Sequence, residues 1–253
     1  MRGREWLLIA VSIAAYFVLE SQEGPAANSW RLKRSYDPAM ARLEIRHSRG
    51  FNHWQWGSDV PWSAIRGLTR EQAGGQPGKV TFALVREAGA LICEGTVRFG
   101  SGSGVFAFKA DPDFAGELAK LGYARPTGDE VWWLAVHDVG LEFARSVREA
   151  GVAASLEDLK KLRIHGVTTE EIGEAQEAGY HYAAEEFVRL RNHGVTLEFA
   201  RTARMLGYDF TSNDLVELRN HQVDGAYLRR LKDAGYANLN ARQIARLRSH
   251  GID

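Results

Sequence analysis

A His-Gly-Val sequence, or a close variant of it, recurs through the second half of this chain at a nearly fixed interval. The copies begin at His137, His165, His193, His221 and His250, at steps of 28, 28, 28 and 29 residues. A repeat of this length indicates a stack of similar supersecondary units, each packed on its neighbours. More than half of the chain is therefore expected to form a repeat architecture, which is typical of proteins that bind rather than catalyse.

Each repeat predicts two short helices, because a second glycine followed by an apolar residue falls halfway between the histidines. Glycine after an apolar-periodic run is a helix-ending signal, since it adopts the left-handed conformation without a Cβ penalty. Helices of about ten residues are roughly 15 Å long and are marginal alone. The residues expected to end them are His165, Gly166, His193, Gly194 and His221 in one helix, and Gly179, Gly207 and Gly235 in the other.

Capping residues and apolar columns support this interpretation. The pairs with capping-box spacing are Thr168 with Glu171, Ser155 with Asp158, Thr211 with Asp214, and Asn240 with Gln243, while Thr196 and Asp224 predict simple N-caps. Apolar columns run through Leu159, Phe187, Leu215 and Ile244, through Leu162, Leu190, Leu218 and Leu247, through Ala144, Ile172, Ala200 and Leu228, and through Val147, Ala175, Ala203 and Leu231. The same spacing places the first helix at Asp113–Tyr123, a loop at Ala124–Asp129 and the next helix at Val131–His137. About nine helices are expected.

The region before the repeats has a different pattern. Alternating apolar and polar residues at Arg42–His47, Val80–Arg86, Leu91–Phe99 and Val105–Lys109 are separated by turns at Glu87–Gly89 and Gly100–Gly104. Short alternating runs between glycine-rich turns predict an antiparallel sheet, here of about five strands. The expected class is α+β, with a small antiparallel β domain at residues 27–110 and an α-solenoid of short helix pairs at residues 111–253.

The N-terminal segment resembles an export signal. Trp6–Leu19 is apolar apart from Ser12, and Arg2 and Arg4 precede it. This apolar core is short for a membrane span, which needs about 20 residues, and fits a secretory signal. Residues 1–26 are therefore interpreted as a signal peptide cleaved after Ala26. An uncleaved anchor and a buried core helix are the alternatives. The expected location is the periplasm or cell envelope, with any membrane contact made only through residues 6–19.

Composition and motifs restrict the function. Lys plus Arg equals Asp plus Glu at 32 each, so nucleic-acid binding is not expected. Cys93 is alone in an alternating strand, which favours a small core residue over a nucleophile. Phosphate-loop, zinc-protease and serine-hydrolase motifs are absent from the sequence. We expect a non-enzymatic protein without cofactor or metal, and a hydrolase without a recognisable motif is the catalytic alternative.

Two polar columns could form sites. The histidines would need to meet across repeats to bind zinc, but a role at the helix C-terminus explains all copies at once. A second column consists of Arg163, Arg191, Arg219 and Arg248. These arginines either form a cationic ladder for an acidic partner or glycan, or they pair with acidic groups and carbonyls of adjacent repeats. We favour the structural role for both columns.

The most aromatic stretch is a candidate for glycan or partner binding. It contains Trp54 and Trp56, and Trp62 follows closely. Exposed indole rings could stack on sugar rings or on a protein surface. Because side chains alternate along a strand, Trp54 and Trp56 would share one face, which could equally be the core of the β domain or its contact with Trp132 and Trp133.

The repeat consensus suggests a family. Residues Arg191–Phe199 read Arg-Asn-His-Gly-Val-Thr-Leu-Glu-Phe, and a Gly-Tyr pair follows at Gly207-Tyr208. This pattern resembles short helical repeats attached to bacterial membrane metallopeptidase sensors of the penicillin-sensing type, and residues 82–108 resemble the region that precedes those repeats. Peptidase helices and the zinc motif are missing from this sequence, so protease activity does not carry over. The resemblance implies a non-catalytic envelope module that binds a protein partner through its repeats. The alternative is glycan or peptidoglycan binding through the tryptophans.

Overall fold

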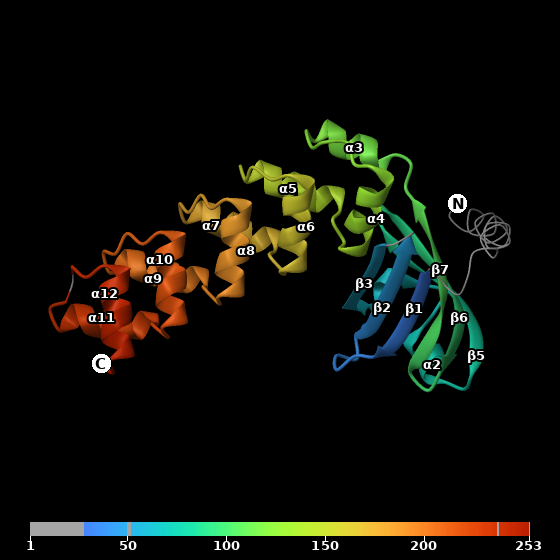
Figure 1. Ribbon diagram of the computed structural model, residues 1–253, viewed down its shortest axis with the longest axis horizontal. Coiled ribbons are helices and arrows are strands. Elements are labelled where there is room, and N and C mark those ends of the chain that lie inside the picture. Colours follow the sequence, from blue (N-terminus) through green and yellow to red (C-terminus); the bar gives the residue numbers. More distant parts are fainter. Residues whose placement is uncertain (1–27, 50–51, 237, 253) are drawn as a thin grey trace. The chain divides into compact units, whose positions relative to one another are not determined.

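The chain consists of a half-barrel of strands followed by a series of short helices (Figure 1). The structure is a computed structural model that describes residues 28–49, 52–236 and 238–252. It divides into two compact units, one that ends at Pro112 and one that spans Asp113–Asp253. The expected α+β class, with a β domain before a helical repeat, is confirmed. The proposed signal at residues 1–26 lies outside the described residues. Among those that are described, no helix is long and apolar enough to cross a membrane.

The first unit is a seven-stranded antiparallel sheet with the order β3-β2-β1-β7-β6-β5-β4. Its strands are β1 (Asn28–Arg34), β2 (Met40–Arg49), β3 (Asn52–Pro61), β4 (Ile65–Arg66), β5 (Gly78–Arg86), β6 (Gly89–Arg98) and β7 (Ser101–Ala110). Two short helical segments, η1 (Trp62–Ala64) and α2 (Arg70–Gly74), lie between β3 and β5. The sequence predicted about five strands and assigned none to Asn28–Arg34, although Trp30 and Leu32 alternate there with polar residues.

The interior of the half-barrel is organised around Trp30. Its indole is 1% exposed, packs edge-on against Phe82 with ring centroids 4.9 Å apart, and donates from Nε1 to the Glu94 carbonyl at 3.1 Å. A Cβ on Gly95 would lie 2.8 Å from this ring, and one on Gly102 would lie 3.0 Å from it. The glycines are therefore needed where the ring and the neighbouring strands approach one another.

This packing corrects one prediction from the sequence. The expected turn at Gly100–Gly104 is confined to Phe99 and Gly100, which have φ values of 48° and 86°, and β7 already begins at Ser101. A Cβ on Gly104 would lie 1.9 Å from the Glu94 carbonyl oxygen. The glycine-rich composition therefore reflects close strand approach at β6 and β7 rather than a long loop.

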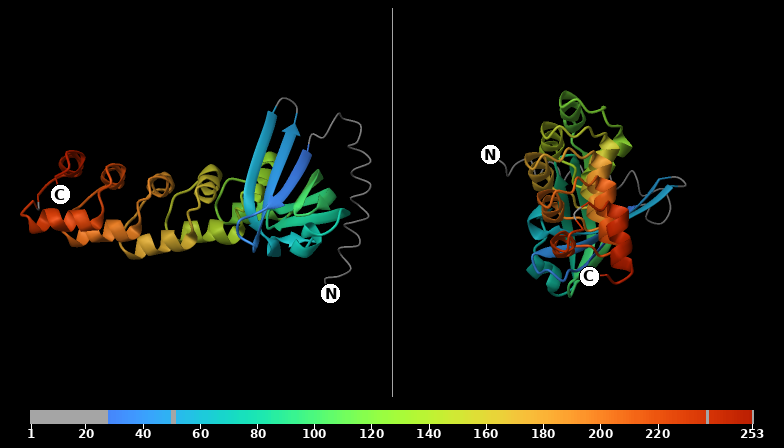
Figure 2. Two further views of the ribbon diagram at one scale, coloured as in Figure 1. Left: turned by 90° about the horizontal axis from the view of Figure 1, so that it is seen from below. Right: turned by 90° about the vertical axis from the view of Figure 1, so that its left-hand side faces the viewer.

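The second unit contains ten helices within its described residues, against the nine expected. They are α3 (Phe114–Lys120), α4 (Gly128–Val136), α5 (Leu141–Glu149), α6 (Leu156–Ile164), α7 (Thr169–Glu177), α8 (Ala184–Asn192), α9 (Leu197–Met205), α10 (Ser212–Asn220), α11 (Gly225–Asp233) and α12 (Ala241–Ser249). The odd-numbered helices from α3 to α11 pack in one row, and the even-numbered helices from α6 to α12 pack in another. Figure 2 shows one row nearly end-on and the other lengthwise.

The predicted caps and columns are present. All four expected capping boxes form, and Thr196 and Asp224 cap α9 and α11. Residues of the four apolar columns are buried, except that Leu247 in the last helix is half-buried. One boundary differs, because the predicted loop at Ala124–Asp129 ends at Thr127. Its hydroxyl caps α4 in a further capping box with Glu130, so Gly128 and Asp129 are helical.

The helix ends follow one hydrogen-bond pattern. After α6, the Gly166 amide donates to the Arg163 carbonyl at 3.1 Å, and the Val167 amide donates to the Leu162 carbonyl at 2.9 Å. This is a Schellman motif, whose residue after the C-cap is left-handed. Gly166 has φ 71°, but Asp138 and Gln222 occupy the equivalent position in two repeats with φ values of 58° and 59°. Those two helix ends therefore carry backbone strain that glycine avoids.

We expect Gln222→Gly to stabilise the protein by about 1 kcal/mol, because glycine removes the Cβ clash of the left-handed conformation. In a chain of this size, such a change raises the Tm by roughly 2–4 °C in a thermal melt. Gly194→Gln is the matched control. Gly194 has φ 65°, and an added Cβ would meet no neighbouring atom within 4 Å, so this variant should lose a similar amount. Equal melting temperatures for the two variants would contradict the prediction.

Candidate functional site

Trp54 and Trp56 belong to the interior face of the β unit. They lie on β3 opposite His47 and Ile45 of β2, and directly paired residues of an antiparallel ladder share a face. Ile45 in turn pairs with Trp30, so both indoles lie on the face that carries the core. Both are half-buried, and the Trp54 ring stacks on the His47 imidazole with centroids 5.4 Å apart. This placement fits the core alternative for the two residues.

Trp62 lies elsewhere, beyond the end of β3 in η1. Six residues of mostly extended chain separate it from Trp56, about 20 Å at 3.3 Å per residue. Half-buried itself, Trp62 lines a hollow of about 540 Å³ together with Lys33, Arg34 and Arg70. The three tryptophans therefore do not form one platform, and Trp62 lies beside cationic side chains.

The histidine column connects successive repeats. His165 donates from Nδ1 to Oδ1 of Asn192 at 2.7 Å, and His193 bonds Oδ1 of Asn220 in the same way at 2.8 Å. His221 Nδ1 lies 2.9 Å from the Ser249 hydroxyl. Each of these histidines is the C-cap residue of its helix and bonds the residue before the C-cap of the equivalent helix one repeat later. Among the described residues, no group of three or more His, Cys, Asp or Glu side chains could hold a metal ion.

The arginine column connects repeats in the opposite direction. The guanidinium carbon of Arg163 lies 5.2 Å from the centre of the Phe143 ring, that of Arg219 lies 5.7 Å from the Phe199 ring, and that of Arg248 lies 5.0 Å from the Tyr227 ring. In each case the ring belongs to the third residue of the preceding odd-numbered helix. Cation–π contacts of this kind are worth roughly 0.5–1 kcal/mol each at exposed sites. Arg163 also forms an ion pair with Asp138 at 2.9 Å.

Arg191 is the exception, because a carboxylate takes the place of the aromatic ring that the other three arginines contact. The third residue of α7 is Glu171, where α5, α9 and α11 have Phe143, Phe199 and Tyr227. The three rings are at most 8% exposed and fill the space between the two rows. Glu171 instead accepts a hydrogen bond from the Thr168 amide at 3.0 Å and pairs with Arg191. The aromatic column is therefore interrupted at a single repeat.

A groove opens beside this interruption. It has a volume of about 470 Å³, lies among α7, α8 and α9, and is lined by Glu171 and Arg191 together with Val167, Tyr182, Phe187, Leu190, Val195 and Leu197. We call it the Glu171 groove. The sequence carried a signal for it, since Glu171 stands in an otherwise aromatic column. That signal was missed because Glu171 also fitted a capping box, which it does form.

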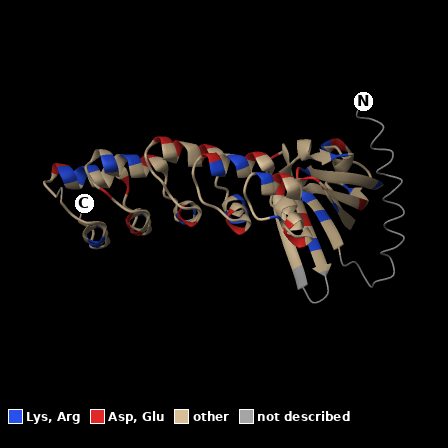
Figure 3. Cartoon of the chain, turned by 90° about the horizontal axis from the view of Figure 1, so that it is seen from above, with Lys and Arg blue, Asp and Glu red and all other residues tan. Residues whose placement is uncertain are grey.

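The rim of the Glu171 groove is acidic. Glu174 and Glu198 line it along with Glu171, whereas Arg191 is the one cation among the lining residues and is already paired with Glu171. Arg201 lies close by, with its guanidinium bonded to the main-chain carbonyl of Glu174 at 3.3 Å. Elsewhere charges of both signs are interspersed along the helices (Figure 3).

Two stacked tyrosines lie between α7 and α8, and one of them, Tyr182, lines the groove. The Tyr180 and Tyr182 rings stack with centroids 5.5 Å apart, and Arg204 lies 3.7 Å from the centre of the Tyr180 ring. Burial raises the pKa of Tyr182 to about 12, helped by the neighbouring Tyr180. Within the described part of the chain, neither hydroxyl has a hydrogen-bond partner. Both hydroxyl oxygens are buried, and each unpartnered buried hydroxyl costs about 1–3 kcal/mol of stability.

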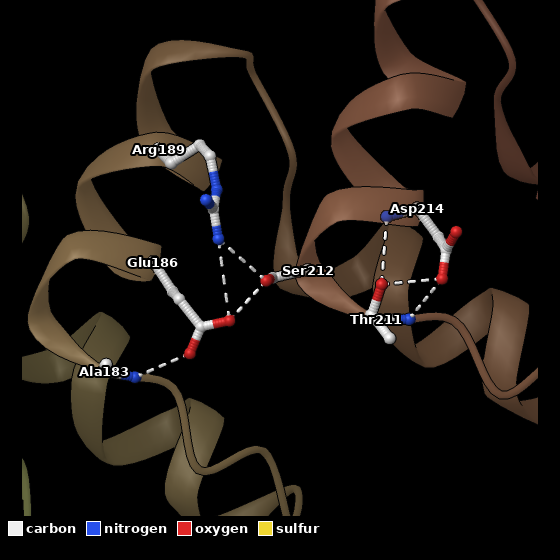
Figure 4. Close-up of polar contacts among 6 residues, drawn as sticks. All are labelled: Ala183, Glu186, Arg189, Thr211, Ser212 and Asp214. Carbon is white, nitrogen blue, oxygen red and sulfur yellow. Dashed lines mark hydrogen bonds and ion pairs between the residues drawn. The ribbon is translucent and has the colours of Figure 1, made fainter.

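A polar cluster next to the groove has a structural role (Figure 4). Glu186 accepts a hydrogen bond from the Ala183 amide at 2.9 Å at the start of α8 and another from the Ser212 hydroxyl of α10. Arg189 donates to Ser212 at 3.1 Å and lies 3.7 Å from Glu186. Thr211 and Asp214 form a separate capping box on α10. The cluster joins neighbouring even-numbered helices, and its serine is bonded to a carboxylate and a guanidinium, with no imidazole among its bonded partners to act as a base.

Cys93 lies in the interior of the half-barrel on β6 and is fully buried. Burial strongly raises the pKa of its thiol, so the reactive thiolate is disfavoured. This agrees with the expectation that Cys93 is a core residue.

Comparison with known proteins does not identify a family. No protein-family model matches the chain, and searches of curated proteins and of solved structures find no match.

His137, the first member of the histidine column, gives a pH prediction. Its ring stacks on Trp133 with centroids 5.6 Å apart. Burial, together with the nearby charge of Lys160, lowers its pKa from 6.5 to about 4, although Glu157 opposes the shift. The unfolded chain therefore binds this proton more readily, and stability falls as the pH drops from 6.5 towards 4. After allowance for solvent exposure, the loss is on the order of 1–2 kcal/mol.

Urea unfolding of wild type and His137→Asn at pH 7.5 and pH 4.5 measures this loss. The wild type should lose more stability between the two pH values than the variant, since the carboxylates common to both contribute equally. Parallel losses in the two proteins would show that His137 does not carry the effect.

Proposed function

We propose that this chain is a non-catalytic interaction module of the bacterial cell envelope, which binds a protein partner through its helical repeats. The observation that carries the proposal is the Glu171 groove. The third residue of α5, of α9 and of α11 is aromatic, and its ring is buried between the two rows of helices. In α7 the third residue is Glu171 instead, and an apolar surface is open to solvent beside it. The envelope location is proposed from the apolar segment at residues 6–19.

The lining of the groove supports a polypeptide ligand. Three consecutive helices, α7, α8 and α9, contribute to it, so a segment lying across them would contact more than one repeat. Extended or helical segments bind such grooves by placing a few side chains into apolar depressions while the rim contributes polar contacts. The histidine and arginine columns are already engaged between repeats, which favours the groove over these columns as the binding surface.

Site-specific crosslinking tests this proposal. Leu197, which lines the groove and is half-buried, is replaced by the photoreactive amino acid benzoylphenylalanine, and Arg229 on the exposed surface of α11 is replaced in a matched control. Irradiation of cells should give a discrete crosslinked species from position 197 and not from position 229. Adding Glu171→Phe should abolish it, because the ring would fill the groove as Phe143 and Phe199 fill theirs.

The same substitution gives a folding control. Glu171→Phe loses one capping-box bond, worth about 1 kcal/mol, and buries a ring worth about 2–3 kcal/mol. The variant is therefore expected to melt no lower than the wild type. Crosslinks that persist unchanged in a well-folded Glu171→Phe protein would refute binding at the groove.

Glycan binding by the β unit is the second candidate, and the hollow beside Trp62 favours it. An indole with Lys33, Arg34 and Arg70 around it suits a sugar ring that bears a carboxylate or phosphate. Lys33 is paired with Glu44 at 2.7 Å, and Arg34 bonds the Phe99 carbonyl at 3.2 Å. Arg70 is exposed at the edge of the hollow.

A sedimentation assay on purified peptidoglycan tests this second candidate. If it holds, Trp62→Ala and Arg70→Gln should each reduce the bound fraction at least fivefold, whereas Arg98→Gln, which is exposed on β6 and does not line the hollow, should not. Wild-type protein that stays in the supernatant would remove the candidate.

A further inference from the structure

We propose that the Glu171 groove selects a segment of a protein partner in which one large apolar side chain is flanked by lysine or arginine. This rests on the proposed function and adds the chemistry of the ligand. The apolar side chain would enter the space that Phe143 and Phe199 occupy in the equivalent repeats, and the cationic groups would meet the carboxylates of the rim.

The apolar part of the inference follows from the comparison among repeats. Within one protein, the same position between the helix rows holds a phenylalanine in α5 and α9 and a tyrosine in α11. At α7 the ring is missing, but the surfaces that would surround it remain, including Phe187, Leu190 and Val195. A volume of about 470 Å³ exceeds that of one side chain, so it admits an aromatic ring together with part of its backbone.

The charge of the ligand follows from the rim. Three carboxylates, those of Glu171, Glu174 and Glu198, line the groove against one guanidinium. Arg191 is paired with Glu171, and Arg201, which is bonded to the main-chain carbonyl of Glu174, does not line the groove. Glu174 and Glu198 are both exposed and line the groove from α7 and α9. An acidic segment would bring like charges together, whereas lysine or arginine would complement them.

The apolar walls and the exposed carboxylates together define the ligand. The groove combines apolar lining with two exposed carboxylates, those of Glu174 and Glu198. These features match a peptide segment that carries one large apolar and one or two basic side chains.

Fluorescence anisotropy with defined peptides tests the inference on the full chain. The probe is a labelled nine-residue peptide of Gly and Ser that carries one Phe between two Lys residues. One control peptide has Ala in place of Phe, and another has Glu in place of both Lys residues. We expect a Kd on the order of 10⁻⁴ M for the probe, at least tenfold weaker binding of each control, and weaker binding at 0.5 M salt.

Variants of the rim carboxylates test how much their charge contributes to peptide binding, apart from the shape of the groove. Glu174→Gln and Glu198→Gln should each weaken the probe at least threefold, and the double variant at least tenfold. Glu177→Gln is the matched control, since Glu177 lies exposed on the same helix but does not line the groove. These substitutions lie at exposed positions, so the result does not depend on Glu171→Phe folding.

The outcomes are distinguishable from those of the proposed function. Equal binding of the Lys and Glu peptides, or no effect of the double variant, would overturn the inference. If neither peptide binds while position 197 still crosslinks a partner in a Glu171-dependent manner, the ligand chemistry is wrong and the groove remains a binding site. If the probe binds with the expected preferences, the inference is supported whichever cellular partner carries such a segment.

Discussion

The helical unit depends on contacts between repeats, because none of its helices can be stable alone. From α4 to α12 every helix has nine residues, below the length at which an isolated helix persists in water. Burial of the apolar columns supplies most of the stability, and the histidine and arginine columns fix how neighbouring helices align. Histidines reach forward by 27 or 28 residues, and arginines reach back to the preceding odd-numbered helix. Each repeat is thereby held from both sides.

Sequence periodicity was sufficient for the helical unit and less so for the sheet. His-Gly pairs and capping residues mark both ends of the helices locally, so their boundaries could be predicted. The sheet was underestimated because β1 has only two inward apolar residues, Trp30 and Leu32, and because Gly102 and Gly104 suggested a loop. Whether a glycine ends a strand or allows close approach depends on the residue opposite, here Glu94 and Trp30, which the sequence does not indicate.

The candidate site shows the same difference between local and non-local information. The cap that Glu171 makes with Thr168 is a local feature and was predicted. The consequence of having glutamate there, an opening between the helix rows, depends on Arg191, Phe187 and Val195 of other helices. The tryptophans show the converse, since their proximity in the sequence suggested one platform, but the length of β3 separates Trp62 from Trp54 and Trp56.

The equivalence of the helix ends has a consequence for how such a chain can change. Gly166 and Gly194 hold the same backbone conformation at the same point of successive repeats. The histidine and arginine columns connect only neighbouring repeats. Loss or duplication of one whole unit of 28 or 29 residues would therefore rejoin matching caps and equivalent contacts between repeats. The helical region can in this way become shorter or longer by whole repeats while the remaining repeats keep their contacts with their neighbours.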